Sequence, residues 1–169
     1  MPARKLRFAG SVAVVAALAA PAAADDAAVQ ALVDRAEIEA LIVQYVTALD
    51  TLDADAYAAV FAEDAVFELP GAVHRGRAAI RKIVTDLQQS RDRNEAAGTP
   101  SPKLYHVLAN TSIDVLDGAN ARHQSYAQTV RAAESGQFVV GFMGRYEDTL
   151  VKRDGRWLIQ SRKLVSFVE

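Results

Sequence analysis

The spacing of apolar residues changes once along this chain, near Lys103, and that change constrains the fold more than any other feature. Before Lys103 the apolar residues recur at intervals of three and four, which is the period of one face of a helix. After Lys103 they alternate with polar residues, which is the period of a strand with one buried face. Helices followed by a run of consecutive strands indicate an α+β domain, in which helices cover one face of a sheet.

Three helices and one short strand are predicted before the change in period. The first helix spans residues 26–50 and carries an apolar stripe from Leu32 to Leu49. Asp53 is placed to cap a second, short helix. The short strand spans 65–69, and the third helix spans 76–96.

Four long strands are predicted after the change in period, at 104–116, 121–132, 138–152 and 156–168. The first two are joined by an Asp-Gly hairpin turn at Asp117, and the last two by another at Asp154. Since the turns are short, neighbouring strands run antiparallel. The polar connection before Lys103 is long, and its conformation cannot be inferred from the sequence.

The first 24 residues have the composition of a secretory signal. Basic residues stand near the start, positions 8–20 carry no charge, and small residues precede Asp25. The apolar run is shorter than the roughly 20 residues of a membrane span. We therefore expect cleavage after Ala24, a periplasmic or secreted protein, and one domain over residues 25–169. The alternative is a buried N-terminal helix.

Composition excludes several classes of function. The chain has no cysteine, so it has neither disulfides nor thiolate metal ligands. The net charge is −2 with mixed signs, which argues against nucleic-acid binding. The three histidines are scattered without a repeated acid spacing, so no metal site is expected. No glycine-rich phosphate loop or nucleophile elbow is present.

Asp50 and His106 are the polar residues that interrupt apolar patterns. The stripe through Ile42 and Val46 leads to an apolar residue at position 50, and an aspartate stands there instead. Such an aspartate is either a solvated helix end or an acid in a pocket, and the residues alone favour the first.

On the strand that contains His106, one face alternates apolar and hydrogen-bonding residues, as a pocket wall does: Leu104, His106, Leu108 and Asn110. The other face, with Tyr105, Val107 and Ile113, is suited to packing a dimer or a second layer. A single histidine on an apolar face is more often structural than catalytic. Of the other two histidines, His74 falls in a loop before the third helix, and no partner or role is indicated for His123.

Several short sequence motifs, and their order along the chain, resemble the SnoaL-like domains of the nuclear transport factor 2-like superfamily. They are Tyr45-x4-Asp50, Phe61-Ala-Glu-Asp-Ala-Val-Phe, Gly76-Arg-x2-Ile, His106-Val-Leu-x-Asn110, Gly144-x-Tyr-x-Asp148 and Gly155-Arg-Trp-x-Ile159. The likeness runs from about Glu37 to Lys163. It implies a cone-shaped fold with three N-terminal helices packed on a curved, mainly antiparallel sheet that encloses a pocket. Members include dehydratases, a dehydrochlorinase, polyketide cyclases, ketosteroid isomerases and noncatalytic subunits, so the fold alone assigns no reaction.

The resemblance also implies roles for five residues. Asp50 and His106 match the catalytic pair of the dehydratases. Tyr45 would donate a hydrogen bond in the pocket, although it also fits a core position on the helix stripe. Asn110 would orient a substrate oxygen, unless its amide only bonds backbone. Arg145 stands where some members keep a pocket arginine, but the position varies among them and a solvated strand arginine is favoured.

We therefore expect a cofactor-independent lyase or isomerase that acts on a hydrophobic small molecule through Asp50 and His106. Histidine titrates near neutral pH, and an aspartate partner would hold its tautomer. The alternative is an exported, noncatalytic protein that binds a small molecule in the same pocket. A structural or assembly partner is a third possibility. A homodimer or higher homo-oligomer is expected, without a membrane or nucleic-acid partner.

Overall fold

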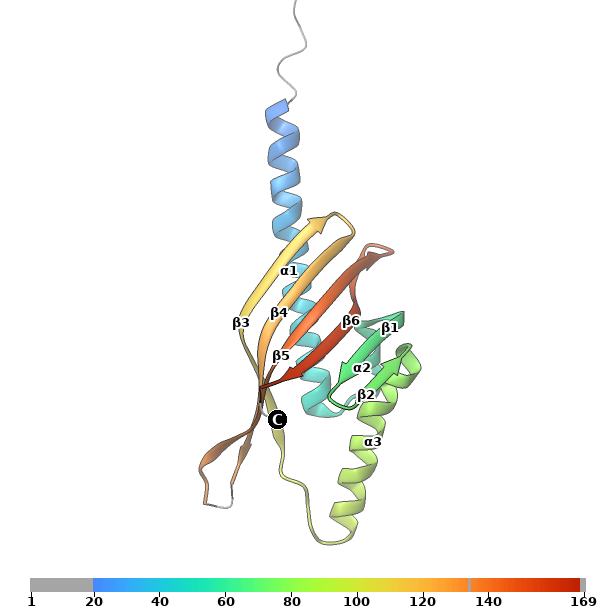
Figure 1. Ribbon diagram of the computed structural model, residues 1–169, viewed down its shortest axis with the longest axis vertical. Helices are drawn as coiled ribbons and strands as arrows, with labels where there is room; N and C mark the ends of the chain where they lie inside the picture. Colours follow the sequence, from blue (N-terminus) through green and yellow to red (C-terminus); the bar gives the residue numbers. More distant parts are fainter. Residues whose placement is uncertain (1–19, 134, 168–169) are drawn as a thin grey trace, which may run out of the picture.

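The helices and strands form one α+β domain, with helices on one face of a mixed sheet (Figure 1). The computed structural model describes residues 20–133 and 135–167. Its elements, in chain order, are α1 (Ala20–Thr51), α2 (Ala54–Ala59), β1 (Phe61–Leu69), β2 (Ala72–Arg75), α3 (Arg77–Ala96), β3 (Leu104–Asp117), β4 (Asn120–Ala132), β5 (Phe138–Arg153) and β6 (Arg156–Ser166). The predicted fold class is confirmed.

The sheet is open and has the strand order β2-β1-β6-β5-β4-β3. Strand β1 runs parallel to β6, and the other neighbours pair antiparallel. The sheet is therefore mainly antiparallel, as expected, with β2 and β3 at its two edges. The short strand β2 was not predicted, because four residues are too few to establish a period.

Local signals set the helix starts. The carboxylate of Asp53 accepts hydrogen bonds from the backbone N–H groups of Asp55 and Ala56, at 3.1 and 2.9 Å, and so caps α2 as predicted. Gly76 precedes α3 with a φ of 82°, a conformation that favours glycine. Residues 1–19 of the expected signal lie outside the described residues, and α1 begins at Ala20, within that expected segment. Cleavage after Ala24 remains a prediction.

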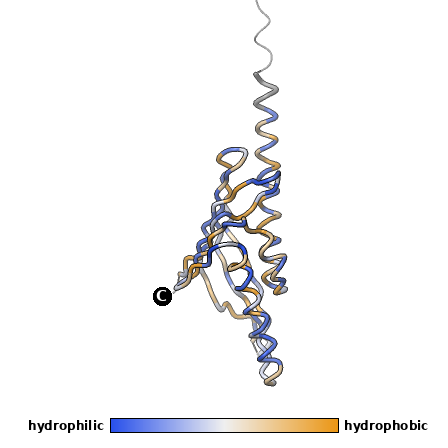
Figure 2. Tube along the Cα trace, turned by 90° about the vertical axis from the view of Figure 1, so that its right-hand side faces the viewer, coloured by the Kyte–Doolittle hydropathy of each residue, from blue (hydrophilic) through white to orange (hydrophobic). Residues whose placement is uncertain are grey.

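The core lies between α1, α2, α3 and the sheet face that they cover, here called the inner face. Its buried apolar side chains include Ile38, Tyr45, Phe61, Ile80, Leu150 and Ile159. The N-terminal part of α1 extends past the end of the sheet (Figures 1 and 2). Leu32, which was expected in the buried stripe, is 68% exposed, because it lies about 200° around the helix from Asp34, which is buried. No helix in the described part of the chain is both long and apolar enough to span a membrane.

A bulge in β3 reverses which residues face the helices. The register with β4 shifts between Ala109 and Ser112, and Asn110 within the bulge has a φ of 50°. Since an inserted residue turns all later side chains to the other face, Ile113 is buried on the inner face. The prediction that Ile113 shares a face with Tyr105 and Val107 is wrong for this reason.

Candidate functional site

Asp50 and His106 meet where the last turn of α1 lies against the beginning of β3. Nδ1 of His106 is 2.6 Å from Oδ1 of Asp50. The backbone N–H of His106 also donates to Asp50, at 3.0 Å to Oδ1 and 3.3 Å to Oδ2. The two side chains are 17% and 18% exposed, so they are partly open to solvent. We call this pair the dyad.

The dyad has the arrangement of an oriented acid–base group. An ionised carboxylate can only accept hydrogen bonds, so the fitting histidine tautomer carries its proton on Nδ1. The lone pair then lies on Nε2, which takes part in none of the hydrogen bonds found within the described ranges. A lone pair held in this way can take a proton from a bound molecule and later return it.

The register of the sheet adds two residues beside His106 that the sequence did not indicate. Thr129 of β4 lies directly opposite His106, and Phe142 of β5 lies opposite Thr129. Side chains opposite one another share a face and have Cβ atoms about 5 Å apart. Counting back from the Asp117 turn would instead place Arg131 opposite His106. The bulges in β3 shift the register, so turn counting alone could not have identified Thr129.

Phe142 lies close to the sheet because Gly144 has no side chain. A Cβ at Gly144 would lie 2.7 Å from the Phe142 ring and 2.5 Å from the carbonyl oxygen of Val165. The glycine thus leaves room for the ring on the inner face.

The other three residues expected at the site lie apart from the dyad. Tyr45 is 1% exposed, and its hydroxyl is within 3.2 Å of the Tyr146 hydroxyl, in the core. Asn110 is exposed at the bulge. Arg145 donates to Glu147 at 3.0 Å and lies on the sheet face away from the helices, here called the outer face. The structure therefore brings together only Asp50 and His106.

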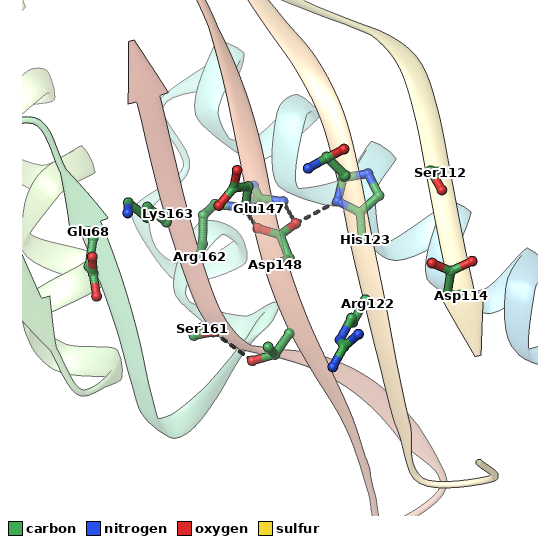
Figure 3. Close-up of a pocket in the computed structure, with 12 residues that line it drawn as sticks. Glu68, Ser112, Asp114, Arg122, His123, Glu147, Asp148, Ser161, Arg162 and Lys163 are labelled. Atoms are coloured by element: carbon green, nitrogen blue, oxygen red, sulfur yellow. Dashed lines mark hydrogen bonds and ion pairs between the residues drawn. The ribbon is translucent and has the colours of Figure 1, made fainter. Parts of the chain in front are cut away.

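His123 belongs to a second polar cluster, which is buried on the inner face (Figure 3). Its Nδ1 lies 2.6 Å from Oδ2 of Asp148. Arg162 donates to the same carboxylate through Nε at 2.8 Å and Nη2 at 2.6 Å. No role was predicted for His123, because its partner lies on the neighbouring strand and is identified only by register: His123 pairs directly with Asp148.

The charges of this buried cluster compensate one another. Burial by itself would raise the pKa of Asp148, but the charge and hydrogen bonds of Arg162, together with His123, hold that pKa below its ordinary value. The Arg162 guanidinium also lies 3.9 Å from the ring centre of Tyr45 and 4.3 Å from that of Tyr146. The side chains of His123, Asp148 and Arg162 are 0% exposed, so a substrate cannot reach them without rearrangement.

A polar groove of about 560 Å³ runs over the same part of the sheet. The exposed or half-buried charged residues that line it come from five strands: Glu68, Asp114, Arg122, Glu147 and Lys163 (Figure 3). Because these charges have both signs, the groove does not select for an anion or a cation. It does not include Asp50 or His106.

Solved structures with the same architecture include several bacterial proteins. A protein of unknown function from Mycobacterium tuberculosis is 28% identical, with a TM-score of 0.67, over 81% of this chain and 73% of that chain. A candidate scytalone dehydratase from Novosphingobium aromaticivorans is 26% identical, with a TM-score of 0.65, over 82% and 87% of the two chains. A nuclear transport factor 2-like protein with a cystatin-like fold, from the same organism, has 23% identity and a TM-score of 0.72 over 85% and 88%.

Comparison of the sequence with known protein families identifies one family. No curated protein matches the chain. The model of the SnoaL-like domain matches residues 30–163, which include α2, α3, most of α1, all of β1 to β5 and most of β6. The chain therefore belongs to the SnoaL-like domain family.

Proposed function

We propose that this protein is a cofactor-independent lyase or isomerase that acts on a hydrophobic small molecule through the Asp50–His106 dyad. The observation that carries the proposal is the 2.6 Å contact between Nδ1 of His106 and Oδ1 of Asp50. That contact leaves Nε2 of a partly exposed imidazole for a substrate. A dehydratase or isomerase reaction is also in keeping with the similarity to the candidate scytalone dehydratase, whose name describes that protein alone.

The proposed chemistry is a proton transfer that needs only the dyad. Nε2 of His106 takes a proton from a substrate carbon, and the electrons of the broken C–H bond form a double bond. In an elimination, the imidazolium returns the proton to the departing hydroxyl, which leaves as water. In an isomerisation, the electrons of a double bond already present in the substrate take the proton back at a different carbon, so that the double bond moves. Asp50 holds the tautomer and offsets the positive charge of the protonated ring.

The test is to identify bound molecules and follow their fate. Native mass spectrometry and solvent extraction would be applied to the purified wild type and to His106→Ala. We expect the wild type to convert a hydrophobic compound that the variant only holds. His74→Ala is the matched control, because His74 lies on β2 at the opposite edge of the sheet from β3. A compound that both proteins hold unchanged would instead identify a noncatalytic binding protein.

A second variant separates chemistry from folding. In Asp50→Asn, the side-chain oxygen can still accept from the His106 backbone N–H, so the contact between α1 and β3 is kept. The amide cannot offset the charge of a protonated imidazole. We expect kcat to fall by about 10²–10⁴-fold with little change in KM or in Tm. Full activity in this variant would contradict a catalytic role for the dyad.

A further inference from the structure

The helix α1 and the edge strand β3 are tied together at two points. Nη1 of Arg35 donates to the carbonyl oxygen of Ile113 at 3.3 Å. At the other end, the backbone N–H of His106 donates to Asp50 at 3.0 Å. The helix between Arg35 and Asp50 is about 22 Å long. The strand between His106 and Ile113 is about 23 Å long. The two segments therefore run side by side in opposite directions and are bonded to each other at both ends. We call this pair of segments the frame.

A groove of about 370 Å³ lies within this frame. It is lined by residues of α1 and β3 only: Glu39, Ile42, Val43, Val46, Thr47, Leu108 and Thr111. The bulge between Ala109 and Ser112 falls in the middle of the frame, where it bends β3. Because β3 is the edge of the sheet, no further strand covers this side of the groove in the described ranges.

The dyad does not line the groove but lies beyond one of its ends. Val46 lies one helical turn before Asp50 on α1, and Leu108 lies two residues after His106 on the same face of β3. A molecule that fills the groove toward this end therefore approaches the dyad along both walls.

The lining determines which molecules fit. Four of the lining residues are aliphatic, and the hydroxyls of Thr47 and Thr111 supply hydrogen-bonding groups. The single charge among the lining residues is that of Glu39, which pairs with Arg35 at 3.4 Å. Because Arg35 offsets the charge of Glu39, the lining carries no unbalanced charge that would attract an ionic ligand. The volume is within the range of small-molecule sites, about 300–1,000 Å³.

We propose that this groove between α1 and β3 binds the apolar body of a neutral small molecule and presents its reacting end to the dyad. The reaction at the dyad rests on the proposed function, whereas binding in the groove does not depend on turnover. The substrate class that follows is a neutral, mainly hydrocarbon molecule with one or two oxygen atoms.

The test uses prodan, a small neutral naphthalene dye whose fluorescence reports an apolar environment. In Val43→Arg, a long charged side chain replaces one that lines the groove and is 64% exposed, so the fold should tolerate it. We expect prodan to bind this variant at least tenfold more weakly than the wild type. Val29→Arg is the control, because Val29 is on the same helix, is 59% exposed and does not line the groove. Equal binding by wild type and Val43→Arg would overturn the proposal.

The position of the dye is checked independently by amide chemical shifts in ¹⁵N-labelled protein. We expect saturable changes at Thr47, Leu108 and Thr111. Chemical-shift changes confined to the outer face, for example at Lys163, would show that the dye binds elsewhere and would overturn the proposal of binding in the groove. His106→Ala should still bind prodan, since His106 does not line the groove. The two proposals can therefore fail separately. If prodan does not bind in the groove, the test of catalysis by the dyad still stands. If the dyad is inactive, prodan should still bind in the groove.

Discussion

Asp148 is a charged residue buried within the sheet's inner face. Its side chain is 0% exposed and lies between His123 and Arg162. We expect Asp148→Asn to lower the free energy of unfolding by about 3–5 kcal/mol, because it leaves the buried Arg162 charge without a counterion. Urea unfolding would measure the change. Asp114→Asn, at an exposed position on β3, should change stability by less than about 0.5 kcal/mol. If Asp148→Asn lowered the free energy of unfolding as little as Asp114→Asn does, the expected stabilisation by the buried Asp148–Arg162 pair would be contradicted.

The lowered pKa of Asp148 also predicts how the stability of the fold depends on pH. The pKa of Asp148 is lower in the folded protein than its ordinary value of 3.8, although burial alone would raise it, because Arg162 stabilises the carboxylate. A depressed carboxyl pKa contributes stability that is present above the unfolded value and is lost as the pH falls through the folded value. We expect wild-type stability to decline below about pH 4 and Asp148→Asn to decline less steeply. Parallel declines in urea titrations at several pH values would contradict this assignment.

Individual residues of the candidate site could be predicted only where they break a pattern. Asp50 interrupts an apolar stripe and His106 stands on an apolar strand face, which marked both as candidates. The resemblance to SnoaL-like domains then implied the pair, and the two side chains meet in the structure. Tyr45 continues the stripe, and its pattern cannot distinguish a core tyrosine from one in a pocket. The partner of His123 was missed because pairing across strands depends on register.

At the scale of elements, a buried carboxylate on α1 bonds the helix to the two strands at the middle of the sheet. Asp34 is 2% exposed and accepts hydrogen bonds from Nζ of Lys152 at 2.7 Å and from Nε1 of Trp157 at 3.2 Å. The hydrogen bond from Lys152 lowers the pKa of this carboxyl below its ordinary value. These contacts join the middle of the helix to β5 and β6.

We expect Asp34→Ala to destabilise the protein by about 2–3 kcal/mol, because Trp157 is buried and would keep an unpaired N–H. Amide hydrogen exchange should show α1 losing more protection than α3, since the broken contacts belong to α1. Asp26→Ala is the control, at an exposed position on the same helix. Unchanged exchange in α1 would show that apolar packing alone holds the helix.

At the scale of the whole molecule, the outer face of the sheet carries exposed apolar side chains. Tyr105, Val107 and Met143 are 44%, 46% and 37% exposed on β3 and β5. Clustered apolar residues on a sheet face often mark an interface between subunits. We expect a homodimer through this face and monomers in Val107→Asp, as measured by sedimentation velocity. Val73→Asp, 54% exposed on β2, should remain dimeric. A monomeric wild type would contradict the expected dimer.

The sequence by itself determined the order and type of the main elements, because helical and strand periods, the Asp53 cap and the Asp-Gly turns are local signals. The residues alone favoured structural roles for Asp50 and His106, and the pair was implied by the resemblance to SnoaL-like domains. Only the tertiary structure decided the parallel pairing of β1 with β6, the bulge that turns Ile113 inward, the His123–Asp148–Arg162 cluster and the groove between α1 and β3. The physical reason is register: one inserted residue changes every later pairing and reverses the face of each side chain, yet it leaves no local pattern in the sequence.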